Sequence, residues 1–118
     1  MADLKTVKKL YKQAPRPMGI YQIKNLANGK IYIGRGADLN GKLNSEKFQL
    51  KNNMHMNQDL QNDFNALGEG MFSFEVLDRL NPREDPQHDH GADLHMLEAL
   101  WLEKLQPFGG KGYHKKKT

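Results

Sequence analysis

Two runs of strand-forming residues flank an Asn-Gly pair near the start of the chain, and this pattern limits the fold most. Residues 19–25 and 30–34 are rich in isoleucine and tyrosine, and Asn28 and Gly29 lie between them. An Asn-Gly pair between two such runs is the strongest short-range signal for a β-hairpin. The sequence therefore predicts two antiparallel strands joined by a tight turn.

The predicted hairpin brings two tyrosines to one face. If the turn has an even number of residues and no bulge, the numbers of paired residues sum to an odd value, so Tyr21 and Tyr32 point to the same side. Two phenols on one side can take part in the same chemistry. Packing of aromatic rings across a hairpin is the commoner use of such a pair, and both interpretations stay open at this point.

The rest of the chain predicts helices and one further strand. Helical spacing of apolar residues, together with proline and glycine stop signals, predicts helices over residues 1–13, 41–51, 57–67 and 93–105. Alternating apolar and polar residues predict a strand over residues 71–77, and residues 81–92 form a polar loop. The predicted fold class is α/β (α+β): a small sandwich with a central three-stranded antiparallel sheet flanked by helices.

Length and composition fit a single polar domain. The 118 residues include no cysteine, which excludes disulfides and cysteine-bound zinc. No apolar run approaches the roughly 18 residues of a membrane helix, and the basic N-terminus lacks the apolar stretch of a signal peptide. We therefore expect a cytoplasmic protein, compatible with association with the nucleoid. We expect residues 1–17 to be an N-terminal helical extension, residues 18–114 the main domain and residues 115–118 a basic tail.

Charge is distributed unevenly along the chain. Residues 1–58 carry a formal charge of +8, residues 59–108 carry −8 and residues 109–118 carry +4, which leaves a net charge of +4. Clustered lysine and arginine bind a phosphate backbone because they release its counterions, so the pattern favours a nucleic-acid partner. Solvated surfaces are also charged in blocks, and this simpler explanation remains open.

One acidic residue falls within an apolar helical stripe. At 100° per residue, Glu98 falls between Leu105 and Leu102, within the apolar stripe of the predicted last helix, which Leu94, Leu97 and Trp101 complete. An unpaired carboxylate there would cost several kcal/mol, so we expect a cation, a strong hydrogen-bond donor or a metal ion beside it. Alternatively, the helix reaches the edge of a cleft and Glu98 meets solvent.

Histidines and acids also alternate near the polar loop. His88, His90 and His95 are interleaved with aspartates, and a His-x-His pair with carboxylates can bind transition metals. A solvated loop is the simpler reading, because nothing in the sequence fixes the geometry. A metal-binding or protein-interaction domain that uses the loop from Pro82 to Gly91 is therefore one functional hypothesis.

The order of motifs resembles a known family. The resemblance covers roughly residues 18–114 and is carried by two tripeptides at hairpin spacing, a histidine before the third predicted helix, a glutamate on the last helix and a closing Gly-Tyr pair. These are Gly19-Ile20-Tyr21, Tyr32-Ile33-Gly34, His55, Glu98 and Gly112-Tyr113. In this respect the chain resembles the GIY-YIG nuclease family, whose members cleave DNA phosphodiesters with a divalent metal.

The resemblance implies a role for each matching residue. Tyr21 would hydrogen-bond or deprotonate the attacking water, and Tyr32 would hold the scissile phosphate and the water. His55 would support proton movement. Glu98 would bind one Mg²⁺ or Mn²⁺ ion, which would polarise a phosphate oxygen. We expect further nucleic-acid contacts from Lys24, Lys47, Lys51 and His114.

The chain departs from the family pattern at the phosphate clamp. Eight residues after Gly34 the family usually has an arginine, whereas this chain has Lys42, which keeps the charge without the bidentate geometry. Arg35 is a candidate to supply a guanidinium instead, although a side chain at a strand end points differently. Glu46 lies one helical turn beyond Lys42 and can neutralise it.

These observations give a first functional hypothesis and an alternative. The first is a metal-dependent DNA endonuclease with low intrinsic sequence specificity. The alternative is a nucleic-acid-binding protein of the same fold that has lost cleavage through Lys42. Whether the DNA is single- or double-stranded, and whether the protein is oligomeric, is left open by the sequence.

Overall fold

The computed structural model describes residues 17–80 and 90–114. The predicted helix over residues 1–13, the tail from residue 115 to 118, and His88 with the rest of residues 81–89 lie outside the described residues. None of the helices in the described ranges is long and apolar enough to cross a membrane.

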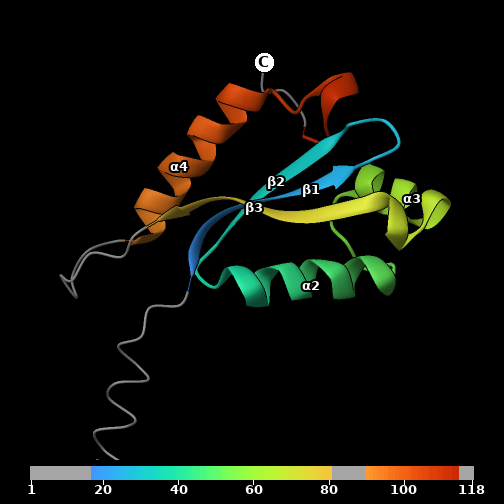
Figure 1. The fold of residues 1–118 in the computed structure, drawn as a ribbon, viewed down its shortest axis with the longest axis horizontal. Coiled ribbons are helices and arrows are strands. Elements are labelled where there is room, and N and C mark those ends of the chain that lie inside the picture. Colours follow the sequence, from blue (N-terminus) through green and yellow to red (C-terminus); the bar gives the residue numbers. More distant parts are fainter. Residues whose placement is uncertain (1–16, 81–89, 115–118) are drawn as a thin grey trace, which may run out of the picture.

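The centre of the molecule is the predicted three-stranded antiparallel sheet (Figure 1). Its strands are β1 (Met18–Asn25), β2 (Ile31–Gly36) and β3 (Phe72–Leu80), in the order β2-β1-β3. Ile23 pairs with Tyr32, and Tyr21 pairs with Gly34, so the paired numbers sum to an odd value. The prediction that Tyr21 and Tyr32 share a face is therefore confirmed.

Three helices follow the predicted pattern, with differences at their starts. They are α2 (Leu39–Lys51), α3 (Gln58–Leu67) and α4 (His90–Leu105), with short 3₁₀ turns η1 (Glu69–Met71) and η2 (Gly109–Lys111). α2 begins two residues earlier than predicted because the Asp38 side chain accepts a hydrogen bond from the Gly41 amide and caps the helix. The Asn57 side chain caps α3 in the same way.

The end of the polar loop was predicted incorrectly. Residues 90–92, assigned to the loop on the basis of their polarity, are the first turn of α4. The third strand likewise runs three residues past its predicted end at Leu77. Its extra residues pair with the start of β1, where Met18 lies opposite Leu80. Such long-range pairing leaves little trace in the local pattern.

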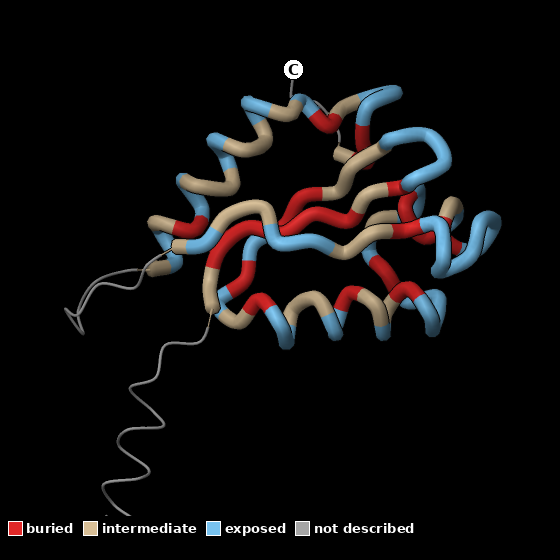
Figure 2. Tube along the Cα trace, viewed as in Figure 1, coloured by how far each residue is buried: buried red, intermediate tan, exposed pale blue. Residues whose placement is uncertain are grey.

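Helices cover both faces of the sheet. Figure 1 shows α4 on one side of the sheet and α2 on the other. The main core lies between the sheet and the pair α2 and α3. Its buried members are Tyr21, Ile23, Leu39, Leu50, Leu60, Phe64, Phe72 and Tyr113. Figure 2 shows these buried segments running along the strands and the inner sides of the helices. Ile20 and Ile33 alternate to the opposite face, toward α4.

Candidate active site

The Tyr21 side chain lies across the neighbouring strand, and a glycine in that strand leaves room for it. Gly34 is its partner in β2, and a Cβ atom at residue 34 would lie 2.2 Å from the Tyr21 hydroxyl oxygen. Any larger residue would displace the phenol. The final glycine of the second tripeptide therefore allows the Tyr21 side chain to pass over β2.

The first tripeptide uses its glycine in a comparable way. A Cβ atom at Gly19 would lie 2.0 Å from the carbonyl oxygen of Asp78, so the glycine allows β1 to approach β3 closely. The register between these strands then shifts between Ile20 and Tyr21. Both glycines thus position the segment that carries Tyr21.

A buried carboxylate, Glu46 of α2, holds several of the predicted site residues together. The Tyr21 hydroxyl donates a hydrogen bond to Glu46 Oε1 over 3.0 Å, and His55 Nε2 hydrogen-bonds to Glu46 Oε2. The Lys42 Nζ lies 3.8 Å from Glu46 Oε1. Glu46 is only 3% exposed. Tyr21, Lys42 and His55 therefore converge on one internal anion.

Glu46 was expected only to neutralise Lys42, although its position in α2 carries a further signal. Leu39, Leu43, Glu46 and Leu50 are spaced by four, three and four residues, which puts the carboxylate within the apolar side of α2. Glu98 occupies the same kind of position on α4. An acid in an apolar stripe needs a partner, so this spacing predicts a partnered carboxylate at Glu46.

The environment of Glu46 favours its ionised form. Burial alone raises the pKa of Glu46, but hydrogen bonds from His55 and Tyr21 and the nearby Lys42 ammonium outweigh it and hold the pKa below its usual value. Burial, followed by repulsion from Glu46, raises the pKa of the Tyr21 phenol far above its ordinary value. The two groups therefore stay as an ionised acid and a protonated phenol.

The proton position on His55 follows from its two partners. The Asn57 backbone amide donates to His55 Nδ1 over 3.0 Å, so Nδ1 carries no proton and Nε2 donates to Glu46. The backbone amide of His55 donates to the Gln61 side-chain oxygen, which fixes the loop between α2 and α3. His55 is thus a buried, oriented imidazole with both nitrogens occupied.

Tyr32 forms an aromatic set with two histidines. Its ring meets His55 edge-on, with centroids 5.3 Å apart, and stacks on His114 at 5.0 Å. Burial, with smaller effects of Glu46 and Glu98, raises the pKa of Tyr32 to about 12. The Tyr32 hydroxyl has no hydrogen-bond partner within the part of the chain that the structure describes. Its oxygen is thus available to a substrate.

His114 also completes the outer edge of β2. The Tyr113 amide donates to the Ile31 carbonyl, and the Ile33 amide donates to His114 Nε2 over 2.8 Å. The imidazole therefore takes the place of a strand partner. Burial lowers the pKa of His114, in agreement with a nitrogen that must stay unprotonated to accept from the amide.

Glu98 has a cationic partner, which is one of the kinds of partner expected from its place in the apolar stripe. Arg35 Nη1 donates to Glu98 Oε1 over 2.8 Å and lies 3.3 Å from His95 Nδ1. Arg35 pairs with Ile20, so its side chain lies on the α4 face of β2, opposite Tyr21. The Glu98 side chain is 19% exposed, and its charge contributes to the raised pKa values of Tyr21 and Tyr32.

The structure leaves the remaining predicted residues outside this cluster. The Lys47 ammonium lies 5.0 Å from the centre of the Phe74 ring, and Lys51 pairs with Glu69 at 3.3 Å. Lys24 is on β1 near Glu75. Among the described residues, no group of three or more histidines and acids is arranged to hold a metal ion.

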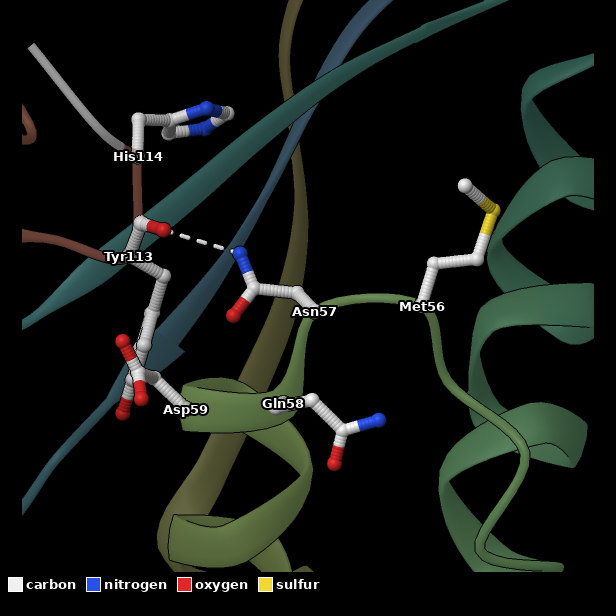
Figure 3. A pocket seen from close by; sticks show the side chains of 6 residues that line it. All are labelled: Met56, Asn57, Gln58, Asp59, Tyr113 and His114. Carbon is white, nitrogen blue, oxygen red and sulfur yellow. Dashed lines mark hydrogen bonds between the residues drawn. The ribbon is translucent and has the colours of Figure 1, made fainter.

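A pocket borders the cluster at the start of α3 (Figure 3). It has a volume of about 310 Å³ and is lined by Met56, Asn57, Gln58, Asp59, Tyr113 and His114. The Asn57 side chain donates to the Tyr113 carbonyl over 2.8 Å, which ties α3 to the C-terminal segment. Met56 is 91% exposed. The walls of this pocket come from segments far apart in the chain, so no local sequence pattern predicts it.

Comparison with solved structures identifies the fold. The catalytic domain of the homing endonuclease I-TevI superposes with a TM-score of 0.68 and 27% identity, over 85% of this chain and 99% of that domain. The chain is a GIY-YIG nuclease-like domain. A point variant of the same catalytic domain gives a TM-score of 0.67 at 26% identity, over 83% of this chain and 92% of that one. The predicted family and fold class are confirmed.

A curated relative gives a consistent result. The GIY-YIG domain is 33% identical over 87 residues to intron-associated endonuclease 1 of Enterobacteria phage T4. The aligned residues make up 74% of this chain. The aligned part is 32% of that relative, so the chain spans about a third of its length. No family model matches the chain.

Proposed function

We propose that this GIY-YIG domain is a DNA endonuclease that hydrolyses phosphodiester bonds. The observation that carries the proposal is the convergence of Tyr21, Lys42 and His55 on the buried Glu46 carboxylate. The likeness to a catalytic domain over 99% of that domain supports it. Phenols, a cation and a buried anion are the groups that phosphodiester hydrolysis needs for proton transfer and charge stabilisation.

In this proposal the exposed groups of the site bind the phosphate. The Lys42 side chain is 42% exposed and reaches toward the site as a mobile point charge. The Tyr32 hydroxyl, which has no partner in the described residues, contacts the phosphate or the attacking water. Arg35 faces the other side of β2 and orients Glu98. The lysine at the clamp position is thus used as a phosphate contact.

We also propose that one Mg²⁺ or Mn²⁺ ion binds at Glu98. Mg²⁺ usually keeps several waters and binds proteins through one or two carboxylates together with substrate phosphates, so a single accessible carboxylate fits it. Glu98 is partly exposed, and Arg35 contacts only its Oε1, which leaves Oε2 for the ion. When bound there, the ion would polarise a phosphate oxygen and stabilise the leaving oxygen.

Low intrinsic sequence specificity belongs to the same proposal. The +8 charge of residues 1–58 suits contacts with phosphates, which carry no sequence information. The pocket beside His114 offers amide groups and the exposed Met56 to the nucleotides next to the cleaved bond. We expect these contacts to position DNA more than to select its sequence.

Plasmid cleavage tests the proposal. The protein is incubated with supercoiled plasmid and with single-stranded DNA in Mg²⁺, Mn²⁺ or EDTA. We expect metal-dependent cutting that Glu98→Gln and Tyr32→Phe abolish. Glu103→Gln, which removes a charge from an exposed position of the same helix, should cut normally. Salt-sensitive DNA binding without cutting under any condition would contradict the nuclease assignment, and no DNA binding at all would contradict the choice of substrate.

A further inference from the structure

We propose that Glu46 is the internal proton acceptor of this site. In this view the attacking water passes a proton to the Tyr21 oxygen while Tyr21 passes its own phenolic proton to Glu46. The inference rests on the proposed nuclease function and adds the destination of the proton. Glu46 acts through Tyr21 and is therefore a positioning and accepting residue that does not contact the DNA.

The burial of Tyr21 makes an internal acceptor necessary. Tyr21 is 1% exposed, and its hydroxyl donates to Glu46 at 3.0 Å. Burial and the Glu46 charge disfavour a phenolate. A phenol that does not ionise can take a proton on its oxygen only if its own proton leaves in the same step. Because the O–H bond points at the Glu46 carboxylate, that is where the proton goes.

The other groups around this pair cannot take the proton. His55 already donates from Nε2 and accepts the Asn57 amide on Nδ1. Lys42 contributes an ammonium, which is a donor only. Tyr32 is a second phenol with a raised pKa, and Glu98 is paired with Arg35 and acts on Tyr21 only through its more distant charge. Glu46 is the acceptor that remains.

The step conserves atoms and charge. The water oxygen forms a new bond to phosphorus as one water proton moves to the Tyr21 oxygen and the phenolic proton moves to Glu46 Oε1. The bond from phosphorus to the leaving oxygen breaks, and the leaving oxygen keeps the electron pair and takes a proton from solvent. After the product leaves, Glu46 returns its proton to solvent through Tyr21.

Lys42 links this acceptor to the arrival of DNA. Its ammonium lies 3.8 Å from Glu46 Oε1 in the free protein and helps to keep the pKa of Glu46 low. Its side chain is flexible and partly exposed, so a DNA phosphate can draw it away from Glu46. The carboxylate then loses a neighbouring cation and becomes a better proton acceptor. A lysine at this position, unlike a rigid arginine fork, permits the exchange.

Glu46→Gln tests the proposal in the full chain. The amide has the same shape but cannot accept the proton, so we expect the cleavage rate to fall by about 10²- to 10⁴-fold while DNA affinity in Ca²⁺ does not fall. Glu46→Asp keeps a carboxylate and should restore part of the rate. Asp63→Asn is the matched control, because Asp63 also accepts from a tyrosine, Tyr113, but lies outside the site. Its rate should equal that of the wild type.

The pH profile separates proton acceptance from a merely structural role. The wild-type rate should be level between about pH 6 and about pH 9, because Glu46 is ionised throughout that range. In Glu46→Gln the Tyr21 proton must be lost to solvent before the reaction, so the cleavage rate should rise about tenfold for each unit by which the pH is raised. The climb should vanish when Tyr21→Phe is added. A structural role would lower the rate equally at every pH.

Each outcome decides the proposal. A Glu46→Gln protein that cuts at the wild-type rate, or that loses the same fraction of its rate at every pH, overturns the acceptor role and leaves the proposed function intact. If Glu46→Gln does not fold, the wild-type profile decides: a rate that falls tenfold per unit between pH 9 and pH 6 overturns the role. A wild-type protein that cuts no DNA overturns the proposed function, and the acceptor role falls with it.

Discussion

Adding a methyl group at Gly34 tests how closely Tyr21 packs across β2. An ideal Cβ at this position would lie 2.2 Å from the Tyr21 hydroxyl oxygen and 2.3 Å from Cζ. Real contacts of this kind do not occur, so Gly34→Ala must push the phenol away from β2. Because the tip of the ring carries the hydrogen bond to Glu46, the displacement also separates Tyr21 from the carboxylate.

The expected cost has two parts. Forcing an extra carbon into a well-packed core costs typically about 1–3 kcal/mol. Losing a hydrogen bond to a charged group costs about 1.5–3 kcal/mol. We therefore expect Gly34→Ala to lower the free energy of unfolding by about 2.5–6 kcal/mol, a large part of the roughly 5–15 kcal/mol of a typical domain.

Urea unfolding followed by circular dichroism measures this change. Gly70→Ala is the matched control, since a Cβ at residue 70 would meet nothing within 4 Å and should leave the midpoint in place. Cleavage activity of Gly34→Ala should fall with the displaced phenol. If Gly34→Ala unfolds within about 0.5 kcal/mol of the wild type, the close approach of Tyr21 to β2 is wrong, because that value is within the range of ordinary surface changes.

Three further predictions concern the core, the edge of β2 and the phosphate contact. Leu60→Ala should cost about 2–5 kcal/mol in urea unfolding because Leu60 is fully buried, whereas Leu67→Ala, at an exposed position, should cost little. Folding lowers the pKa of His114 below its ordinary 6.5, so the unfolded chain binds the proton first and the stability falls as the pH drops below about 6.5. The free energy of unfolding should therefore be lower at about pH 5 than at about pH 7.5. His114→Asn should reduce this difference. Lys42→Ala should reduce the slope of log affinity for DNA against log salt by about one, and an unchanged slope would exclude a phosphate contact.

The hairpin and its register were predictable because they depend on local chemistry. Asn28-Gly29 fixed the turn, and the two-residue period of a strand then placed Tyr21 and Tyr32 on one face. The same parity places Arg35 on the opposite face, where the structure has it paired with Glu98. A cation was one of the kinds of partner predicted for Glu98. That the cation is Arg35 could not be predicted, because it depends on how α4 packs against β2.

The Glu46 cluster was harder to predict because it joins three elements. Tyr21, Glu46 and His55 come from β1, α2 and the loop before α3, and only the folded chain brings them together. The helical position of Glu46 among leucines was a usable local signal. The tyrosine that reaches it was not, because the path of Tyr21 over β2 depends on a glycine in a different strand.

The way in which residues 112–114 complete the edge of β2 bears on the order of folding. Ile31 and Ile33 come early in the chain, yet their partners are Tyr113 and His114, about eighty residues later. Contacts of such long sequence separation form late, because the loop they close is costly before other structure exists. During synthesis, the sheet and α2 can emerge and pair while Tyr32 still lacks its stacking partner. The site therefore becomes complete only after His114 has been made, and a nascent chain that stops short of it carries the tyrosines without the finished edge that holds them.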